Sequence, residues 1–447
     1  MKSKKSEPAT SVSASFGDLR SVDGRLVIGG CDAVELAEKY GTPLYVFDVA
    51  RAQKTAEAYV DVLKREYPDF TVCYASKAFC CTGIYSILAP LGLGADVVSG
   101  GELYTAIKGG MQPADIYFHG NNKTEREIEY ALSAGVGCFV VDSLLELDLI
   151  SKHATSPQNV LIRVNPGVEA HTHSFIQTAT PDSKFGFSIA DGSAESVIRA
   201  ATERKNVHFA GIACHIGSQI FEKQSFEIAI DKMTDFIVRL NSIGINVERL
   251  DLGGGFGIHY VEHDLPLTPE QYMTNTARYL KAAVKSRGIT PPRLIVEPGR
   301  SIVGEAGITL YKVGAIKTIK DLKTYAAVDG GMFENPRVAL YDARYIAVAA
   351  DRCDAACDTV YSIAGKCCES GDVIIDGIKL PELKTGDVLA VLSTGAYHYS
   401  MASNYNRNPV PPVVAVKDGR SAYMVKPQTY EDIVRNDVIP MLSEDRK

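Results

Sequence analysis

Lys77 is the residue whose position most clearly indicates chemistry. It ends the run TVCYASK (residues 71–77), whose β-branched and aromatic residues are typical of a buried strand. Lysine is rarely buried without a partner, so three roles are open: a surface lysine, a partner for an anion, or a nucleophile that forms an imine. The neighbours Cys73, Tyr74 and Phe79 are apolar enough to lower the pKa of the amine, which favours the imine.

Other polar residues follow further strand-like runs in the same way. They are Ser99, His119 with Asn121, Asp142, Arg163 with Asn165, His215 with Ser218, and Glu297 with Arg300. Two glycine-containing turns belong to this series: DLGGGFG (251–257), with Gly254 and Gly255, and EPGR (297–300), with Gly299. Because glycine lets backbone N–H groups approach oxygens closely, the two turns predict a phosphate site.

A lysine that forms an imine and faces a phosphate site predicts pyridoxal 5'-phosphate as the cofactor. Glu297 would pair with the protonated ring nitrogen and keep the ring an electron sink. His215 could stack on the ring, and a structural histidine is the rival explanation.

The second half of the chain supplies candidate substrate contacts. The segment GKCCESGD (365–372) puts the thiol of Cys368 beside the carboxylate of Glu369, although a lone cysteine is most often an apolar filler. Two further segments carry Arg337, Tyr341 and Tyr397, and their arginine and tyrosines suit recognition of a carboxylate.

These residues need a scaffold that gathers the ends of strands. Short apolar runs alternate with amphipathic segments between about residues 71 and 300, and they give eight candidate strands: TVCYA, GADVVS, DIYFHG, CFVVDS, VLIRVNP, HFAGIACHIG, ERLDLGGG and RLIVEPG. Eight such units close a (β/α)8 TIM barrel, whose catalytic groups lie at the carboxyl ends of the strands. After residue 307, closely spaced strands predict a C-terminal antiparallel β-domain, which the early runs RLVIGG and TPLYVFD would complete. We therefore predict a disordered leader over 1–22, N-terminal strands that join the β-domain over 23–50, the barrel over 51–307 and the β-domain over 308–447.

Composition restricts the class of protein. The net charge of −7 argues against binding of nucleic acid or an anionic membrane, and no run of about 18 apolar residues predicts a membrane span. The ten cysteines form no C-x-x-C pair, so we expect no metal site and a reduced, cytoplasmic protein. A small-molecule enzyme fits best.

An ordered set of motifs resembles one family. YASKA, GADVVSGGEL, RVNPG, HTHSFIQTATPDSKFGF, CHIGSQ, LDLGGGFGI, EPGRSIVGEAG, CESGD and GAYHYSMASNYN together resemble diaminopimelate decarboxylase, among the fold type III pyridoxal-phosphate enzymes that include alanine racemase and ornithine decarboxylase. The resemblance implies decarboxylation of meso-2,6-diaminopimelate to L-lysine and CO2, the last step of lysine biosynthesis. It also implies a homodimer whose partner subunit donates the CES loop to the active site.

The resemblance implies a role for each matching residue. Lys77 would carry the cofactor as an imine, His215 would stack on the ring, and Cys368 would return a proton to the substrate. The other cofactor contacts would be Ser218, Gly254, Gly255, Glu297, Gly299, Arg300 and Tyr397. The substrate contacts would be Arg300, Arg337, Tyr341, Glu369 and Tyr397. The sequence departs from the family's usual pattern at Val338 and Glu305, where proline and asparagine are common.

Three alternatives remain open at this point. A decarboxylase of the same fold could act on D-ornithine, D-lysine, L-ornithine, arginine or another amino-acid intermediate. A racemase would share the lysine and the phosphate site, and it would need a second base. A non-catalytic pyridoxal-phosphate carrier would lack the proton donor or the substrate arginines, and both kinds of residue are present here.

Overall fold

The first part of the protein is a closed barrel of parallel strands. The computed structural model describes residues 19–168 and 183–440. Within them the eight predicted barrel strands all form: β5 (Phe70–Ala75), β6 (Gly94–Val97), β7 (Ile116–Phe118), β8 (Cys138–Val141), β9 (Gln158–Asn165), β11 (Val207–Ala213), β12 (Arg249–Asp251) and β13 (Arg293–Val296). Each pairs in parallel with the next, and β13 pairs with β5, so the sheet closes on itself. The short β10 (Phe187–Ser188) adds to β9 outside this ring.

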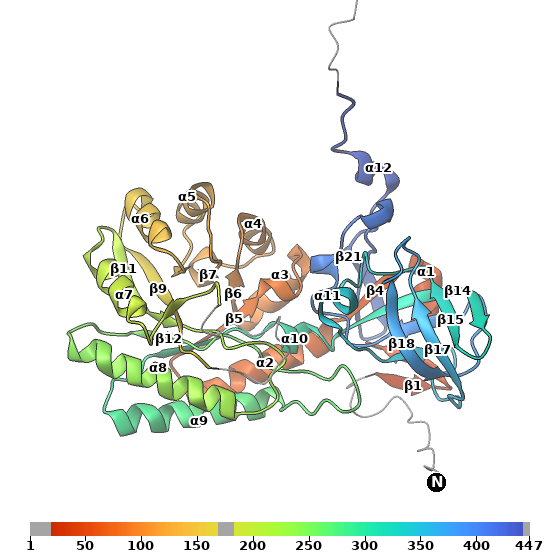
Figure 1. Ribbon diagram of the computed structural model, residues 1–447, viewed down its shortest axis with the longest axis horizontal. Coiled ribbons are helices and arrows are strands. Elements are labelled where there is room, and N and C mark those ends of the chain that lie inside the picture. Colours follow the sequence, from red (N-terminus) through yellow and green to blue (C-terminus); the bar gives the residue numbers. More distant parts are fainter. Residues whose placement is uncertain (1–18, 169–182, 441–447) are drawn as a thin grey trace, which may run out of the picture.

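Helices cover the outside of the barrel (Figure 1). They are α2 (Val49–Glu66), α3 (Thr82–Leu88), α4 (Gly100–Lys108), α5 (Glu125–Ala134), α6 (Leu144–His153), α7 (Ser193–Glu203), α8 (Gln224–Ser242), α9 (Pro269–Arg287) and the short α10 (Arg300–Val303). Helix α8 buries residues at spacings of three and four, such as Ile230, Met233 and Ile237, which is the amphipathic pattern expected of a covering helix. The strands thus carry apolar side chains on both faces, one toward the helices and one toward the barrel interior.

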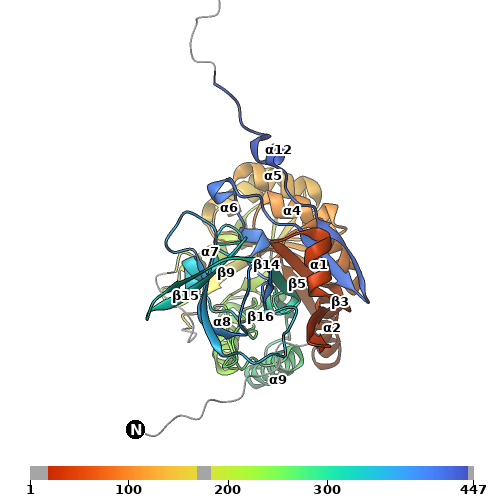
Figure 2. The ribbon, with the colours of Figure 1, turned by 90° about the vertical axis from the view of Figure 1, so that its right-hand side faces the viewer.

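The second part is a mostly antiparallel β-domain beside the barrel. Its longest strand is β14 (Gly307–Ile319), which pairs with β15 (Lys323–Val328), β19 (Val388–Val391) and β4 (Leu44–Asp48). The remaining strands are β16 (Ala347–Ala349), β17 (Thr359–Ala364), β18 (Val373–Leu380), β20 (Val413–Lys417) and β21 (Arg420–Val425). Two pairs are parallel: β15 with β17, and β20 with β4. Figure 2, turned by 90°, shows β14 and β15 in this domain, which faces the viewer.

The N-terminal segment completes the β-domain, as the sequence predicts. Strand β4, from the run TPLYVFD, lies between β14 and β20. The run RLVIGG differs from the expectation, because its β2 (Arg25–Ile28) joins β1 (Arg20–Val22) and β3 (Cys31–Asp32) in a separate sheet. Leu26 and Ile28 of β2 still pack in the same apolar cluster as Leu44 and Ile308. The N-terminal chain therefore belongs to this part of the core.

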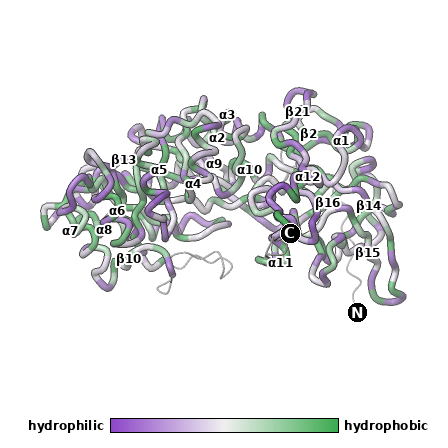
Figure 3. The backbone as a smooth tube through the Cα atoms, turned by 90° about the horizontal axis from the view of Figure 1, so that it is seen from above, coloured by the Kyte–Doolittle hydropathy of each residue, from purple (hydrophilic) through white to green (hydrophobic). Residues whose placement is uncertain are grey.

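Two sequence predictions concern residues that the structure describes only in part or not at all. The predicted leader falls mostly outside the described residues, and its last residues, Arg20–Val22, form β1. The HTHSFIQT segment (171–178) also lies outside them. The limits proposed for the barrel and the β-domain stay predictions. In the described ranges no helix has the length and apolar character needed to cross a membrane, and Figure 3 shows hydrophobic and hydrophilic residues interspersed along both parts.

A buried carboxyl group makes the stability of the β-domain depend on pH. Glu334 is fully buried, and its Oε1 accepts hydrogen bonds from the Tyr311 hydroxyl at 2.5 Å and from the Gly331 N–H at 3.1 Å. Burial raises the pKa of Glu334 to about 8, from the 4.5 expected in the unfolded chain. Between these two values the unfolded chain releases a proton that the folded chain keeps, so stability falls as pH rises through this range.

Glu334→Gln should therefore remove this pH dependence. The amide keeps an acceptor for Tyr311 and Gly331 and cannot ionise. We expect the Tm of the variant to exceed that of the wild type by at least about 2 °C at pH 8 and to match it near pH 4.5. Thermal melts at several pH values, with the exposed Glu57→Gln as control, measure this. Parallel Tm curves for the wild type and Glu334→Gln would contradict the prediction.

Candidate active site

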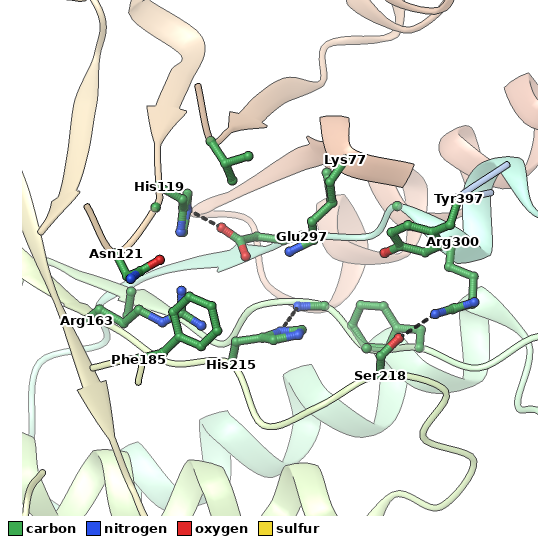
Figure 4. Close-up of a pocket in the computed structure, with 18 of the residues that line it drawn as sticks. Lys77, His119, Asn121, Arg163, Phe185, His215, Ser218, Glu297, Arg300 and Tyr397 are labelled. Carbon is green, nitrogen blue, oxygen red and sulfur yellow. Dashed lines mark hydrogen bonds and ion pairs between the residues drawn. The ribbon is translucent and has the colours of Figure 1, made fainter. Parts of the chain in front are cut away.

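A cavity of about 550 Å3 opens at the carboxyl ends of the barrel strands, against the β-domain. Most of the residues that the sequence singles out line it: Lys77, His215, Ser218, Gly254, Gly255, Glu297, Gly299, Arg300, Arg337, Tyr341 and Tyr397. Cys368 and Glu369 do not line it. Figure 4 shows the barrel residues of this set, with Tyr397 of the β-domain beside Arg300. Lys77 and Tyr397 belong to different domains and are 320 positions apart in the chain, yet both line this one cavity.

Lys77 lies in the 3-10 turn Ser76–Ala78 that follows β5, and its side chain is 44% exposed toward the cavity. Burial lowers the pKa of this amine, but the negative charge of Asp96, whose Oδ2 lies 3.9 Å from Nζ, contributes to a net pKa above the ordinary value. The sequence prediction of a lowered pKa is therefore wrong. The apolar neighbours on which that prediction rested, Cys73, Tyr74 and Phe79, do not line the cavity. Cys73 lies in the barrel core, and the Tyr74 hydroxyl donates to the carbonyl of Phe79 at 2.8 Å.

Glu297, at the end of β13, is held by a buried polar cluster. His119 Nε2 lies 2.6 Å from Glu297 Oε1, 3.9 Å from Asp96 Oδ1 and 4.0 Å from Asp251 Oδ2. Burial would raise the pKa of Glu297, but His119 and a hydrogen bond from Asp251 hold it well below its usual range. Burial and the charge of Glu297 raise the pKa of Asp251 well above its usual value. The cluster thus holds Glu297 in its charged form at the cavity wall.

The same cluster bears on the expectation of no metal. Among the described residues, Asp96, His119 and Glu297 each offer a ligand atom, all within 4.8 Å of one another, so a divalent ion could be held there. The absence of a metal stays a prediction, and treatment with EDTA should leave activity unchanged if it is right.

His215 follows β11 and carries no charge. Burial lowers its pKa to about 3, and the nearby cations Lys77 and Arg163 act in the same direction. Its Nδ1 accepts a hydrogen bond from the Gly254 N–H at 3.3 Å, so the proton of the neutral ring is on Nε2. A neutral, oriented imidazole that lines the cavity can present its ring face to an aromatic ligand.

The glycine run after β12 is required by close backbone packing. A Cβ on Gly254 would lie 2.2 Å from the carbonyl oxygen of Glu297, and one on Gly255 would lie 2.3 Å from that of Gly217. Gly255 also has φ +95°, which favours glycine. Beside this loop, Arg300 donates to the Ser218 hydroxyl at 2.8 Å. A hydroxyl, a cation and a glycine loop at one end of the cavity form a donor set that suits a phosphate group.

Two buried arginines line the cavity, and we call Arg300 and Arg337 the arginine wall. Their exposed fractions are only 7% and 8%. Arg300 donates to the Tyr260 hydroxyl at 2.6 Å, and Arg337 donates to the Tyr345 hydroxyl at 2.7 Å. No Asp or Glu in the described ranges pairs with either guanidinium. Two buried cations with only neutral partners favour an anionic ligand in the cavity.

The sequence left several cavity residues without a role. His119, Asn121 and Arg163 were visible as polar residues at strand ends, and all three line the cavity. Phe185 also lines the cavity but does not follow a predicted strand, whereas Asp96 lies inside strand β6 and does not line the cavity. The guanidinium of Arg163 lies 4.3 Å from the centre of the Phe185 ring, which closes one side of the cavity (Figure 4).

Cys368 and Glu369 lie in a loop of the β-domain, both exposed. The Cys368 N–H donates to Asn406 Oδ1 at 2.8 Å, and Glu369 Oε1 accepts from the Gly371 N–H at 3.3 Å. Neither side chain meets the cavity of its own chain. All ten cysteines of the protein are free thiols.

The residues present fit pyridoxal phosphate. Lys77 supplies the amine, the Ser218–Arg300 pair beside the glycine loop supplies donors for the phosphate, and Glu297 supplies a charged carboxylate for a ring nitrogen. His215 supplies a neutral ring face.

Comparison with known proteins agrees with this fit. The model of the pyridoxal-dependent decarboxylase family, pyridoxal-binding domain, matches residues 53–304. The diaminopimelate decarboxylase of Halalkalibacterium halodurans is 47% identical over 421 residues, which cover 93% of this chain and 95% of that relative. That of Bacillus subtilis is 47% identical over 419 residues, with 93% and 95% covered. The crystal structure of diaminopimelate decarboxylase from M. jannaschii in complex with L-lysine superposes with a TM-score of 0.88 at 37% identity, covering 95% of this chain and 99% of that one. The chain belongs to the diaminopimelate decarboxylases, within the pyridoxal-dependent decarboxylase family.

Proposed function

We propose that this protein decarboxylates meso-2,6-diaminopimelate to L-lysine and CO2 with pyridoxal phosphate as cofactor, as its family does. One observation carries the proposal beyond family membership: a single cavity is lined by Lys77, by the charged Glu297 and by the arginine wall. The first pair suits the cofactor. The wall suits a carboxylate that the reaction leaves in place, which a substrate with two carboxyl groups provides.

The cofactor contacts follow from the chemistry of each side chain. Bound pyridoxal phosphate supplies an electron sink for the electron pair that remains on Cα when CO2 leaves. Lys77 would hold the cofactor through its amine. Glu297 would keep the ring nitrogen protonated, and His215 would fix the plane of the ring. Ser218, Gly254, Gly255, Gly299 and Arg300 would bind the phosphate, with Tyr397 at the edge of the same site.

Substrate recognition would come mainly from the β-domain side. Arg337 and Tyr341 line the cavity from that domain, and Arg300 lines it from the barrel. With Tyr397 they would orient the distal carboxylate. An analogue without that group would leave buried cations unpaired, so discrimination against monocarboxylate substrates should be strong.

Turnover with purified holoenzyme tests the substrate. We expect L-lysine and CO2 from meso-diaminopimelate, and negligible CO2 from D-ornithine, D-lysine, L-ornithine or arginine, because these lack the second carboxylate. Activity on one of the monocarboxylates alone would overturn the proposal.

We also infer a homodimer, because Cys368 and Glu369 lie outside the cavity of their own chain. In the proposed assembly each cavity receives Cys368 from the partner subunit, where it returns a proton to Cα. The cytoplasmic location expected from the sequence stays a prediction.

Mixing two inactive variants tests this arrangement. Lys77→Ala and Cys368→Ala should each be nearly inactive alone. If the residues of one site come from two subunits, random dimers restore one intact site in half of the molecules, so about a quarter of wild-type activity should return after subunit exchange. Failure to recover activity, with exchange verified by mass spectrometry, would place both residues in the site of one chain.

A further inference from the structure

The arginine wall spans two domains, and two tyrosines, Tyr260 and Tyr397, lie against both of its members. Arg300 belongs to the barrel and Arg337 to the β-domain. Tyr260, in the loop after β12, accepts a hydrogen bond from Arg300 at 2.6 Å, and its ring centre lies 5.0 Å from the Arg337 guanidinium. Tyr260 is 7% exposed and also packs edge-on against Tyr345, the partner of Arg337. Of these two tyrosines, Tyr260 also accepts a hydrogen bond from Arg300, so its position contributes to the distance between the two cations.

A partly buried carboxylate outside the cavity fixes the loop that carries Tyr260. Glu305 Oε1 accepts hydrogen bonds from the His259 N–H at 2.9 Å and from His259 Nδ1 at 3.0 Å, and Glu305 Oε2 pairs with Arg51. Because a carboxylate can only accept, His259 Nδ1 carries a proton. Burial would raise the pKa of Glu305, but His259 and Arg51 hold it below the usual value. Glu305 is thus a charged anchor for His259, the residue that immediately precedes Tyr260 in the chain.

The anchor joins the segments where the two domains meet. Arg51 is in the first turn of α2, directly after β4 of the β-domain, and Glu305 lies between α10 and β14. From the β-domain side, Ser393 donates to the His259 carbonyl at 2.8 Å. Asp264 holds the Tyr260 N–H at 2.8 Å within the loop itself. The contacts of Glu305 and Ser393 tie the loop to both domains, whereas that of Asp264 is local.

We propose that Glu305 is a positioning residue for substrate recognition: by holding His259 it places Tyr260, and through Tyr260 it keeps Arg300 and Arg337 at the spacing that one substrate carboxylate requires. This rests on the proposed assignment of the two arginines to substrate. Glu305 touches neither substrate nor cofactor. It therefore affects affinity for the dicarboxylate and leaves the chemistry at Lys77 and Glu297 intact.

Steady-state kinetics of holoenzyme variants test this. Glu305→Ala should raise the KM for meso-diaminopimelate about tenfold and the inhibition constant of L-lysine by a similar factor, since L-lysine keeps the carboxylate in question. The kcat should change less than about threefold, and the absorbance of the bound cofactor should not change. Glu305→Gln keeps an acceptor for His259 but sets an amide N–H group against Arg51. Its KM should therefore lie between that of the wild type and that of Glu305→Ala. The matched control is Glu66→Ala, which removes a carboxylate–arginine pair, with Arg278, at the far end of α2.

A double-mutant cycle decides whether Glu305 acts through Tyr260. Tyr260→Phe should raise KM by removing the acceptor of Arg300, and adding Glu305→Ala should raise it little further, because the two act on one contact. Additive effects on KM would overturn the inference. The inference would also be overturned if Glu305→Ala lowered only the Tm, which is the result expected for the control Glu66→Ala, while Arg337→Ala raised KM. In that case the proposed function would still stand. If Arg337→Ala left KM unchanged, the substrate assignment would itself be wrong and the inference would fall with it. Should Glu305→Ala not fold, Glu305→Gln and Tyr260→Phe give the same comparison.

Discussion

Lys77→Ala should abolish decarboxylation, with a loss in kcat of at least about 10³-fold. The substitution removes the amine that would hold the cofactor and a group able to move a proton at Cα, and general acid–base catalysis alone contributes about 10²- to 10⁴-fold. The phosphate donors near Ser218 and Arg300 remain, so pyridoxal phosphate should still bind, but reversibly. The pKa of Lys77 lies above its ordinary value, so the free amine is protonated near neutral pH.

Borohydride treatment followed by peptide mapping measures the attachment directly. In the wild type the reduced cofactor should be found on Lys77, and in Lys77→Ala it should be found on no lysine. Lys152→Ala is the matched control, because Lys152 is an exposed lysine paired with Glu125. Reduction of the cofactor onto another lysine in the wild type would remove Lys77 from its proposed role.

Glu297→Gln should lower kcat by about 10²- to 10³-fold while the cofactor stays bound. An amide has nearly the same shape as the carboxylate, but it cannot hold a proton on the ring nitrogen by charge, so the electron sink is weakened. The pKa of Glu297 lies well below its usual range, so the carboxylate stays charged across the working pH range. The acid limb of the kcat profile should therefore come from another group.

The readouts for Glu297→Gln are kcat and the absorbance spectrum of the bound cofactor, both of which should change. The dissociation constant of the cofactor should change little, because Glu297 does not contribute to phosphate binding. His119→Asn should give a smaller loss in the same direction, since it removes the imidazole whose Nε2 lies 2.6 Å from Glu297 and leaves the carboxylate in place. A Glu297→Gln enzyme with wild-type kcat would show that Glu297 has no electronic role.

The sequence by itself determined the architecture. Each barrel strand is a short apolar run between amphipathic segments, and such patterns are local, so all eight strands could be found without tertiary information. The polar residues at strand ends were equally visible, because a parallel barrel brings the carboxyl ends of its strands to one face. These two regularities placed Lys77, His215, Glu297 and Arg300 at one site in advance.

Only the tertiary structure decided the electrostatics of the site. Sequence neighbours suggested a lowered pKa for Lys77, whereas Asp96, contributed by the adjacent strand β6, raises it. Arg300 meets Ser218, 82 positions away, and Arg51 meets Glu305, 254 positions away. Charge interactions fall off with distance in space and not along the chain, so residues that are far apart in sequence can control the same group. The residue types were fixed by the sequence, but which of them share a proton or a charge depended on how the barrel closes against the β-domain.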